Sequence, residues 1–268
     1  MLAAPGLLVL VGFFMIPVAF VAHDAFSEGL AAFGRVFVNP LFWSSLLGSL
    51  ELTISASVFS LLVGFAVALH LSRLGPKLRA VLLFMIALPL TFSCLLVAFG
   101  FILTYGRAGF VTQLLSYAGV DPVLFARILY SPIGLGFASS YYLIPRVVLL
   151  LLPVLLNFES IQITAAESLG ATRGQALRDI LIPQILPTAV TACCLVAAVV
   201  FGAYGTALAL VGTRLNILPL QLYSLISETG SDFPAAAALS LLLTAICSAV
   251  MAVGEVFAAR SEAQHVAP

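Results

Sequence analysis

Long apolar stretches dominate this chain, and short polar segments separate them. Crossing the hydrocarbon core of a bilayer takes about 20 apolar residues in a helix. A helix is favoured there because its backbone hydrogen bonds close within the segment. We predict six transmembrane helices, at residues 2–22, 43–71, 81–104, 128–155, 184–211 and 234–258. The pattern therefore predicts an all-α membrane protein.

Composition supports this interpretation. Of the 268 residues, 62% are hydrophobic and 8% are charged, whereas an ordinary globular domain carries about 25% charged residues. A soluble fold of this size could not hide so much apolar surface. The formal net charge is zero, so charge gives no indication of nucleic-acid binding.

The first apolar segment lacks the positively charged start of a removable signal peptide. We therefore expect a retained first helix at 1–23, a transmembrane core at 42–259 and a short polar tail at 260–268. Basic residues are densest in the 72–80 loop, and such loops usually face the cytoplasm. We predict that this loop, the 156–183 segment and both termini lie on the cytoplasmic side.

The 156–183 segment is too long and too regular for a simple connection. Thr164 and Glu167 have the spacing of a capping box, which satisfies free backbone donors at a helix start. Gly170 is suited to end the short helix that follows, because glycine accepts a left-handed conformation. We predict a second helix over 172–182, with Pro183 opening the next transmembrane helix.

This segment resembles the EAA loop of ABC importer permeases, with the pattern E-A-A, three residues, G, eight or nine residues, then I-x-L-P. The matching positions here are Thr164, Ala165, Ala166, Gly170, Ala171, Ile180, Ile182 and Pro183. Two departures occur, because Thr164 stands at the acidic position and Ile182 at the leucine position. Glu167 lies nearly one turn away and is a candidate replacement for the missing carboxylate.

The resemblance implies the type I, methionine-importer-like fold of six transmembrane helices with a cytoplasmic coupling helix. That helix would dock on a separate ABC ATPase subunit, and the residues implied in coupling are Thr164, Ala165, Ala166, Glu167, Gly170, Ala171, Ile180 and Pro183. The implied partners are ATPase subunits, a second permease subunit, identical or different, and an extracytoplasmic solute-binding protein. The implied location is the bacterial inner membrane. An ordinary amphipathic interfacial helix is the alternative.

Three further stretches extend the resemblance along the chain. Residues 87–90 and 105–109 are similar to the third span and following loop of polyamine, phosphonate and iron permeases, and 201–206 is similar to their fifth span. The resemblance favours a polyamine such as spermidine or putrescine as the solute. An aminophosphonate, ferric iron or another small anion is the alternative.

Ionisable residues at membrane depth are expensive and mark functional candidates. Arg146 and Glu51 are such residues, and we predict substrate-pathway roles for them and for Tyr204 and Thr206. Each also has a structural interpretation, because arginine can snorkel and small residues let helices pack closely in lipid. Arg146 would suit an anion and Glu51 a cation.

The sequence lacks the motifs of several other classes. No phosphate-binding loop of the G-x-x-x-x-G-K-[ST] type is present, so we expect no enzymatic activity here, with ATP and magnesium on the partner ATPase. The three histidines are far apart and do not suggest a metal site. We interpret the four cysteines as small packing residues. An ion-coupled transporter is a less favoured alternative, because it needs buried acidic residues near the midplane.

Overall fold

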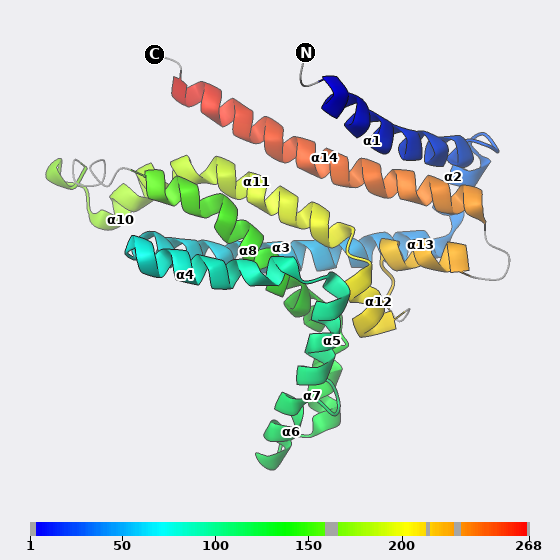
Figure 1. Ribbon diagram of the computed structural model, residues 1–268, viewed down its shortest axis with the longest axis horizontal. Coiled ribbons are helices and arrows are strands. Elements are labelled where there is room, and N and C mark those ends of the chain that lie inside the picture. Colours follow the sequence, from blue (N-terminus) through cyan, green and yellow to red (C-terminus); the bar gives the residue numbers. More distant parts are fainter. Residues whose placement is uncertain (1–3, 159–165, 213–214, 228–231, 267–268) are drawn as a thin grey trace. The chain divides into compact units, whose positions relative to one another are not determined.

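The computed structural model describes residues 4–158, 166–212, 215–227 and 232–266, and these residues form helices joined by short connections (Figure 1). The chain divides into two compact units. The first comprises residues 1–50 and 213–248, and the second comprises 51–212 and 249–268. The longest helices are α1 (Ala4–Ala25), α3 (Pro40–Ser72), α8 (Pro132–Asn157), α11 (Ile182–Phe201) and α14 (Phe233–Val266).

Several shorter helices complete the two units. They are α2 (Ala31–Val38), α4 (Pro76–Ala87), α5 (Cys94–Tyr105), α6 (Phe110–Tyr117), α7 (Pro122–Leu129), α10 (Arg173–Ala176), α12 (Gly205–Val211) and α13 (Leu218–Ser227).

Five stretches in the described part of the chain are long and apolar enough to cross a membrane. They are Pro40–Ser72, Cys94–Tyr117, Pro132–Asn157, Arg178–Phe201 and Phe233–Arg260. Helix α1 supplies a shorter apolar stretch, Val11–Ala25. The predicted all-α membrane fold is therefore confirmed, with the first apolar stretch shorter than the other five.

The first unit is held together by close contacts at two places. Ser49 of α3 accepts a hydrogen bond of 2.9 Å from the backbone N–H of Leu218, at the start of α13. One residue earlier, Gly48 lies so close to Asn216 that an added Cβ would overlap its carbonyl oxygen. At another point, Arg35 of α2 forms an ion pair with Asp232, directly before α14.

Helix α8 is the most deeply buried helix of the second unit. Leu135, Leu143, Val147, Val148 and Leu151 are all at most 1% exposed. Helix α11 packs along α8, and α12 packs against both α5 and α8. Helices α5, α6 and α7 gather beside the first half of α8 (Figure 1).

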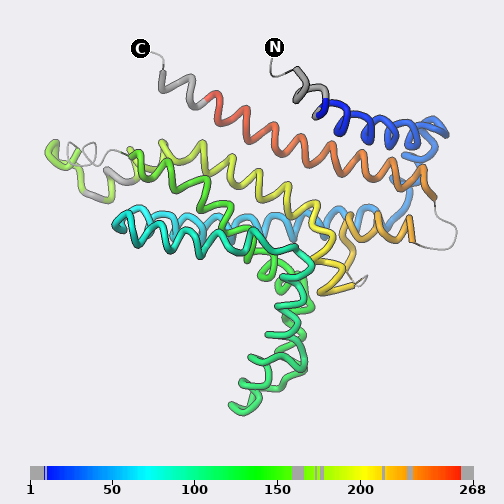
Figure 2. The backbone as a smooth tube through the Cα atoms, viewed as in Figure 1, coloured from blue at the N-terminus to red at the C-terminus, as the bar shows by residue number. Residues whose placement is uncertain are grey.

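The predicted single helix at 81–104 is wrong, because the chain breaks in its middle. Helix α4 ends at Ala87, a short 3-10 turn, η1, covers Leu88–Thr91, and the extended Phe92 and Ser93 precede α5. Pro89 lies in this turn, and proline removes a backbone donor and restricts the residue before it. The Ser93 hydroxyl caps α5 by accepting a 3.2 Å hydrogen bond from the Leu96 N–H. The chain changes direction here (Figure 2).

The predicted helix at 184–211 is also interrupted. Helix α11 ends at Phe201, and α12 begins at Gly205. Glycines at 202 and 205 flank the interruption, and glycine is a poor residue for a helix interior because it loses much conformational freedom there. Both breaks lie in the second unit.

Candidate functional site

The two helix breaks face the same cavity. Its volume is about 370 Å³, and it is lined by Pro89, Leu90, Phe92, Cys94, Tyr142, Arg146, Val199, Gly202, Ala203, Tyr204, Gly205 and Thr206. Residues from the first break, from α8 and from the second break thus meet around one space. Three of the predicted pathway residues, Arg146, Tyr204 and Thr206, line it together.

Arg146 is the charged residue of this cavity. Its guanidinium donates a 2.7 Å hydrogen bond from Nη1 to the backbone carbonyl of Tyr142, one turn earlier in α8. The guanidinium carbon also lies 5.6 Å from the centre of the Tyr142 ring, within the range of a cation–π interaction. Both contacts hold one side of the guanidinium against α8, and neither involves a carboxylate.

The hydroxyl groups of Tyr142 and Thr206 form the buried wall of the cavity. Their oxygens are 3.3 Å apart, which joins α8 to α12. Tyr142 is 7% exposed and Thr206 is fully buried. Thr206 was among the predicted pathway residues and Tyr142 was not, because a tyrosine in an apolar helix carries no signal of its own.

Cys94 departs from the prediction that all four cysteines are packing residues. It is exposed and lines the cavity, whereas the other three cysteines are partly buried. A Cβ placed on Gly205 would come within 2.7 Å of the Cys94 sulfur. Glycine at 205 therefore lets α12 approach the start of α5 closely.

Glu51 does not take part in this cavity. It lies on α3 with an exposed side chain, and its backbone carbonyl accepts a hydrogen bond from the Ser55 hydroxyl. The structure thus separates Glu51 from Arg146, Tyr204 and Thr206.

The segment resembling the EAA loop contains a sharp helix end. Thr164 and Ala165 lie outside the described residues, and the helical residues described begin at Ala166. Gly170 has a φ of +93°. The N–H of Gly170 bonds to the carbonyl of Glu167, and the N–H of Ala171 bonds to the carbonyl of Ala166, both at 3.0 Å. These are the two hydrogen bonds of a Schellman motif, so the predicted helix end at Gly170 is confirmed.

A second helix begins immediately afterwards, and it has a capping box that the sequence reasoning missed. The Thr172 N–H donates to Gln175 Oε1 at 2.9 Å, and the Gln175 N–H donates to the Thr172 hydroxyl at 3.3 Å. The T-x-x-Q spacing of these residues carries this signal. Gly170 and this capping box together define the turn between the two helices.

The second helix does not end at residue 182 as predicted. Helix α10 passes through a π-helical turn, η2, at Leu177–Leu181 directly into α11. Ile180 lies in that turn, and Pro183 lies in the first turn of α11. Proline is tolerated there because the first N–H groups of a helix have no intrahelical acceptor. We call residues 166–181 the elbow.

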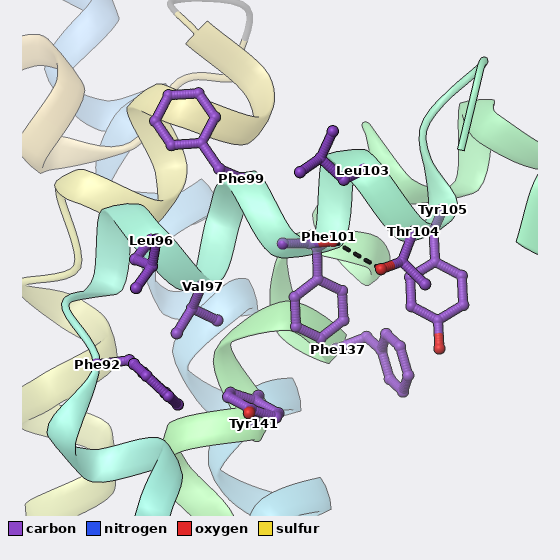
Figure 3. A pocket seen from close by; sticks show the side chains of 11 residues that line it. Phe92, Leu96, Val97, Phe99, Phe101, Leu103, Thr104, Tyr105, Phe137 and Tyr141 are labelled. Atoms are coloured by element: carbon purple, nitrogen blue, oxygen red, sulfur yellow. Dashed lines mark hydrogen bonds between the residues drawn. The ribbon is translucent and has the colours of Figure 1, made fainter. Parts of the chain in front are cut away.

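A larger cavity of about 570 Å³ lies beside α5 and the first half of α8 (Figure 3). Its walls are mostly apolar, and Phe101 is the centre of an aromatic cluster. The ring of Phe101 lies 5.6 Å from that of Phe137 and 5.9 Å from that of Tyr141. This lining offers a polar solute little compensation for lost water, so the smaller cavity with Arg146 is the better candidate site.

Within the described ranges, no group of three His, Cys, Asp or Glu side chains is placed to hold a metal ion. The four cysteines are all free thiols.

The helical membrane architecture and the cavity at its broken helices define a membrane transport component. Residues 57–263 match the family described as the binding-protein-dependent transport system inner membrane component. The match covers most of the chain, and the chain therefore belongs to this family. The predicted type I ABC importer permease fold is confirmed.

Curated relatives and solved structures agree with this assignment. The chain is 28% identical to the spermidine/putrescine permease protein PotB of Haemophilus influenzae, over 90% of this chain and 83% of that protein. It is 27% identical to the molybdenum permease protein ModB of Mycobacterium tuberculosis, over 82% of this chain and 81% of that protein. A bacterial alginate ABC transporter, crystallised with an alginate-bound periplasmic protein, has a chain of similar fold. Its TM-score is 0.74 at 18% identity, covering 97% of this chain and 93% of that chain.

Proposed function

We propose that this chain is the permease subunit that passes a small solute across the membrane by alternating access, driven by a separate ATPase subunit. The elbow, together with Thr164 and Ala165 that precede it, takes up the movement of the ATPase. Arg146, Tyr204 and Thr206 contact the solute. ATP and magnesium bind the ATPase partner, and this chain performs no chemistry of its own.

One structural observation carries this proposal. The Schellman motif at Gly170 and the capping box at Thr172 fix the angle between two consecutive helices. The second of these helices continues into α11, which packs along α8, the helix that holds Arg146. A displacement of the elbow therefore has a short and stiff path to the cavity.

The remaining partners follow from the family. A second permease subunit, identical or different, would complete the membrane pathway, and an extracytoplasmic binding protein would deliver the solute. The assembly would lie in the bacterial inner membrane, with the elbow and both termini in the cytoplasm. The alginate transporter, solved in complex with a periplasmic protein, supports the expectation of a binding-protein partner.

Two observations favour different solutes. The PotB relatives support a polyamine such as spermidine or putrescine. The guanidinium in the cavity supports a small anion, and the ModB relatives agree with that alternative. An aminophosphonate belongs to the same alternative class, whereas ferric iron would need acidic or oxygen-rich ligands at this cavity.

The coupling role is tested by Gly170→Leu in the complete transporter. Leucine cannot adopt a φ of +93° without strain, so the Schellman motif should distort. We expect solute uptake and the stimulation of ATPase activity by the loaded binding protein both to fall at least about tenfold, a barrier change of about 1.4 kcal/mol.

Gly75→Leu is the matched control. Gly75 directly precedes α4, outside the elbow, its φ is −63°, and nothing comes within 4 Å of the position of an added Cβ. This variant adds the same bulk without backbone strain and should retain most of the uptake. Normal uptake and normal ATPase stimulation in Gly170→Leu would show that the elbow does not couple the two subunits.

A further inference from the structure

We infer that the cavity at Arg146 selects solutes carrying an anionic oxygen group, such as a carboxylate, phosphonate or oxyanion, and disfavours polycations. This inference rests on the proposed permease function and narrows its substrate class. The observation behind it is the unbalanced charge of the cavity.

The charged side chain that lines the cavity is positive. Arg146 supplies a guanidinium, and among the described residues no acidic side chain lines the space. The hydrogen bond from Nη1 ends on a backbone carbonyl, and the ion pairs in the described part of the chain do not include Arg146. The positive charge of the cavity is therefore not neutralised by a neighbouring carboxylate.

The other polar groups suit an oxyanion. The guanidinium presents planar donors that match carboxylate and phosphate oxygens. Tyr204 and the hydrogen-bonded pair of Tyr142 and Thr206 line the same space, and that pair keeps one hydroxyl donor because the other is used between them. Hydroxyl groups can donate to an anion, and an arginine flanked by such donors is a common anion-binding arrangement.

The helix break adds to the positive potential. Helix α5 is twelve residues long and begins at Cys94, which lines the cavity. The N-terminal end of a helix carries a partial positive charge. The C-terminal end of α11, at Val199 and Gly202, also lines the cavity and carries a partial negative charge. The full charge of the guanidinium therefore sets the sign of the potential, which attracts an anion and repels a polyamine.

Glu51 does not offset this charge. It is the acidic candidate from the sequence, but it is exposed on α3 and does not line the cavity. The separation of Glu51 from Arg146 decides between the two substrate signs that the sequence had left open.

Cys94 provides a natural reporter inside the cavity. In the test, Cys193, Cys194 and Cys247 are replaced with alanine in the full chain. This variant is produced as part of its complete transporter in membrane vesicles. The remaining thiolate is then modified by anionic sulfonatoethyl methanethiosulfonate or cationic trimethylammonioethyl methanethiosulfonate. Each reagent forms a mixed disulfide with Cys94 and releases methanesulfinate, and its rate is normalised to its reaction with a small neutral thiol.

We expect the anionic reagent to be favoured, and its rate relative to that of the cationic reagent to fall about tenfold in Arg146→Gln. Arg146→Lys should keep most of the preference because it keeps the charge. Arg127→Gln, which removes an exposed arginine of α7 that does not line the cavity, should leave the preference unchanged. The ratio cancels any effect of Arg146 on thiol reactivity that is common to both reagents.

A protection experiment identifies the source of the anionic group. Inorganic phosphate and molybdate are expected to slow labelling of Cys94 at constant ionic strength, and spermidine is not. The vesicles contain either zwitterionic lipid alone or added phosphatidylglycerol. Protection by phosphatidylglycerol without protection by the soluble anions would assign the site to a lipid headgroup and overturn the solute class.

Three other results would also overturn the inference. They are an unchanged reagent ratio in Arg146→Gln, a preference for the cationic reagent in the parent, and no labelling by either reagent with or without ATP. The Gly170→Leu experiment measures coupling independently of charge. A failed charge preference therefore leaves the permease proposal standing, and a failed coupling test leaves the labelling result unaffected.

Discussion

The hydroxyl oxygens of Tyr142 and Thr206 lie 3.3 Å apart and join two helices that are far apart in the sequence. Tyr142 belongs to α8, and Thr206 lies in the first turn of α12, just after the second helix break. Both residues are buried, so water competes little for this hydrogen bond. The pair fixes the restarted helix against the most buried helix of its unit.

A double-mutant cycle with Tyr142→Phe and Thr206→Val should measure this contact. Interhelical hydrogen bonds in membrane proteins contribute about 0.6 kcal/mol on average, and we expect a coupling energy of this size in the free energy of unfolding. Tyr141→Phe is the matched control, because Tyr141 is 42% exposed. Purely additive effects of the two substitutions would contradict the contact.

The contact of Gly48 with Asn216 predicts a strong effect of a single methyl group. Gly48→Ala should destabilise the first unit by about 1–3 kcal/mol, the usual cost of overpacking, because the new Cβ would meet a backbone carbonyl rather than a flexible side chain. Thermal unfolding of the purified chain in detergent measures this effect.

Gly34→Ala provides the comparison within the same unit. Gly34 lies in α2, and nothing comes within 4 Å of an added Cβ. Alanine is the better helix former by up to about 1 kcal/mol, so this variant should be neutral or slightly more stable. Equal stability of the two variants would show that α3 does not pack tightly against residue 216.

The ion pair between Arg35 and Asp232 predicts a dependence of stability on pH. The hydrogen bonds from Arg35, at 2.8 and 3.0 Å, hold the pKa of Asp232 below its ordinary value. A carboxyl group with a depressed pKa in the folded state stabilises the fold above its unfolded pKa of about 3.9, and this contribution is lost as the pH falls through the folded pKa.

Asp232→Asn should therefore lower the melting temperature at neutral pH, and the difference from the parent should shrink below about pH 4. Asparagine can still accept the capping hydrogen bond that Ala235 donates to Asp232. Asp121→Asn is the control, because Asp121 caps α7 through Val123 and forms no ion pair within the described residues. A pH-independent difference for Asp232→Asn would exclude the ion pair as its cause.

The membrane helices could be predicted because each depends on its own local pattern. Apolar length alone located α3 and α8 to within about four residues of their observed bounds, and it located the apolar stretch Phe233–Arg260 of α14 to within two residues. Gly170 was predicted as a helix end because a left-handed residue after a short helix is almost always glycine, and its φ of +93° agrees.

The helix breaks and the cavity could not be predicted in the same way. The residues from 81 to 104 remain apolar through the break at Pro89, so hydropathy gives no sign of it. Cys94, Tyr142 and Thr206 meet only through the packing of α5, α8 and α12. Glu51 and Arg146 were both candidates in the sequence as ionisable residues, and only the folded chain shows that Arg146 lines the cavity and Glu51 does not.

The interruption at Phe92 and Ser93 also indicates which side of the subunit faces away from the hydrocarbon tails of the lipid. Both residues are extended, so the helical hydrogen-bond pattern is interrupted between the Phe92 N–H, which donates to the Pro89 carbonyl, and the Ser93 carbonyl, which accepts from the Val97 N–H. Peptide groups left without such partners are not tolerated against hydrocarbon and occur only where protein or water covers them. The surface at this interruption must therefore be covered by water or by protein, which restricts how the chain can be oriented in the plane of the bilayer.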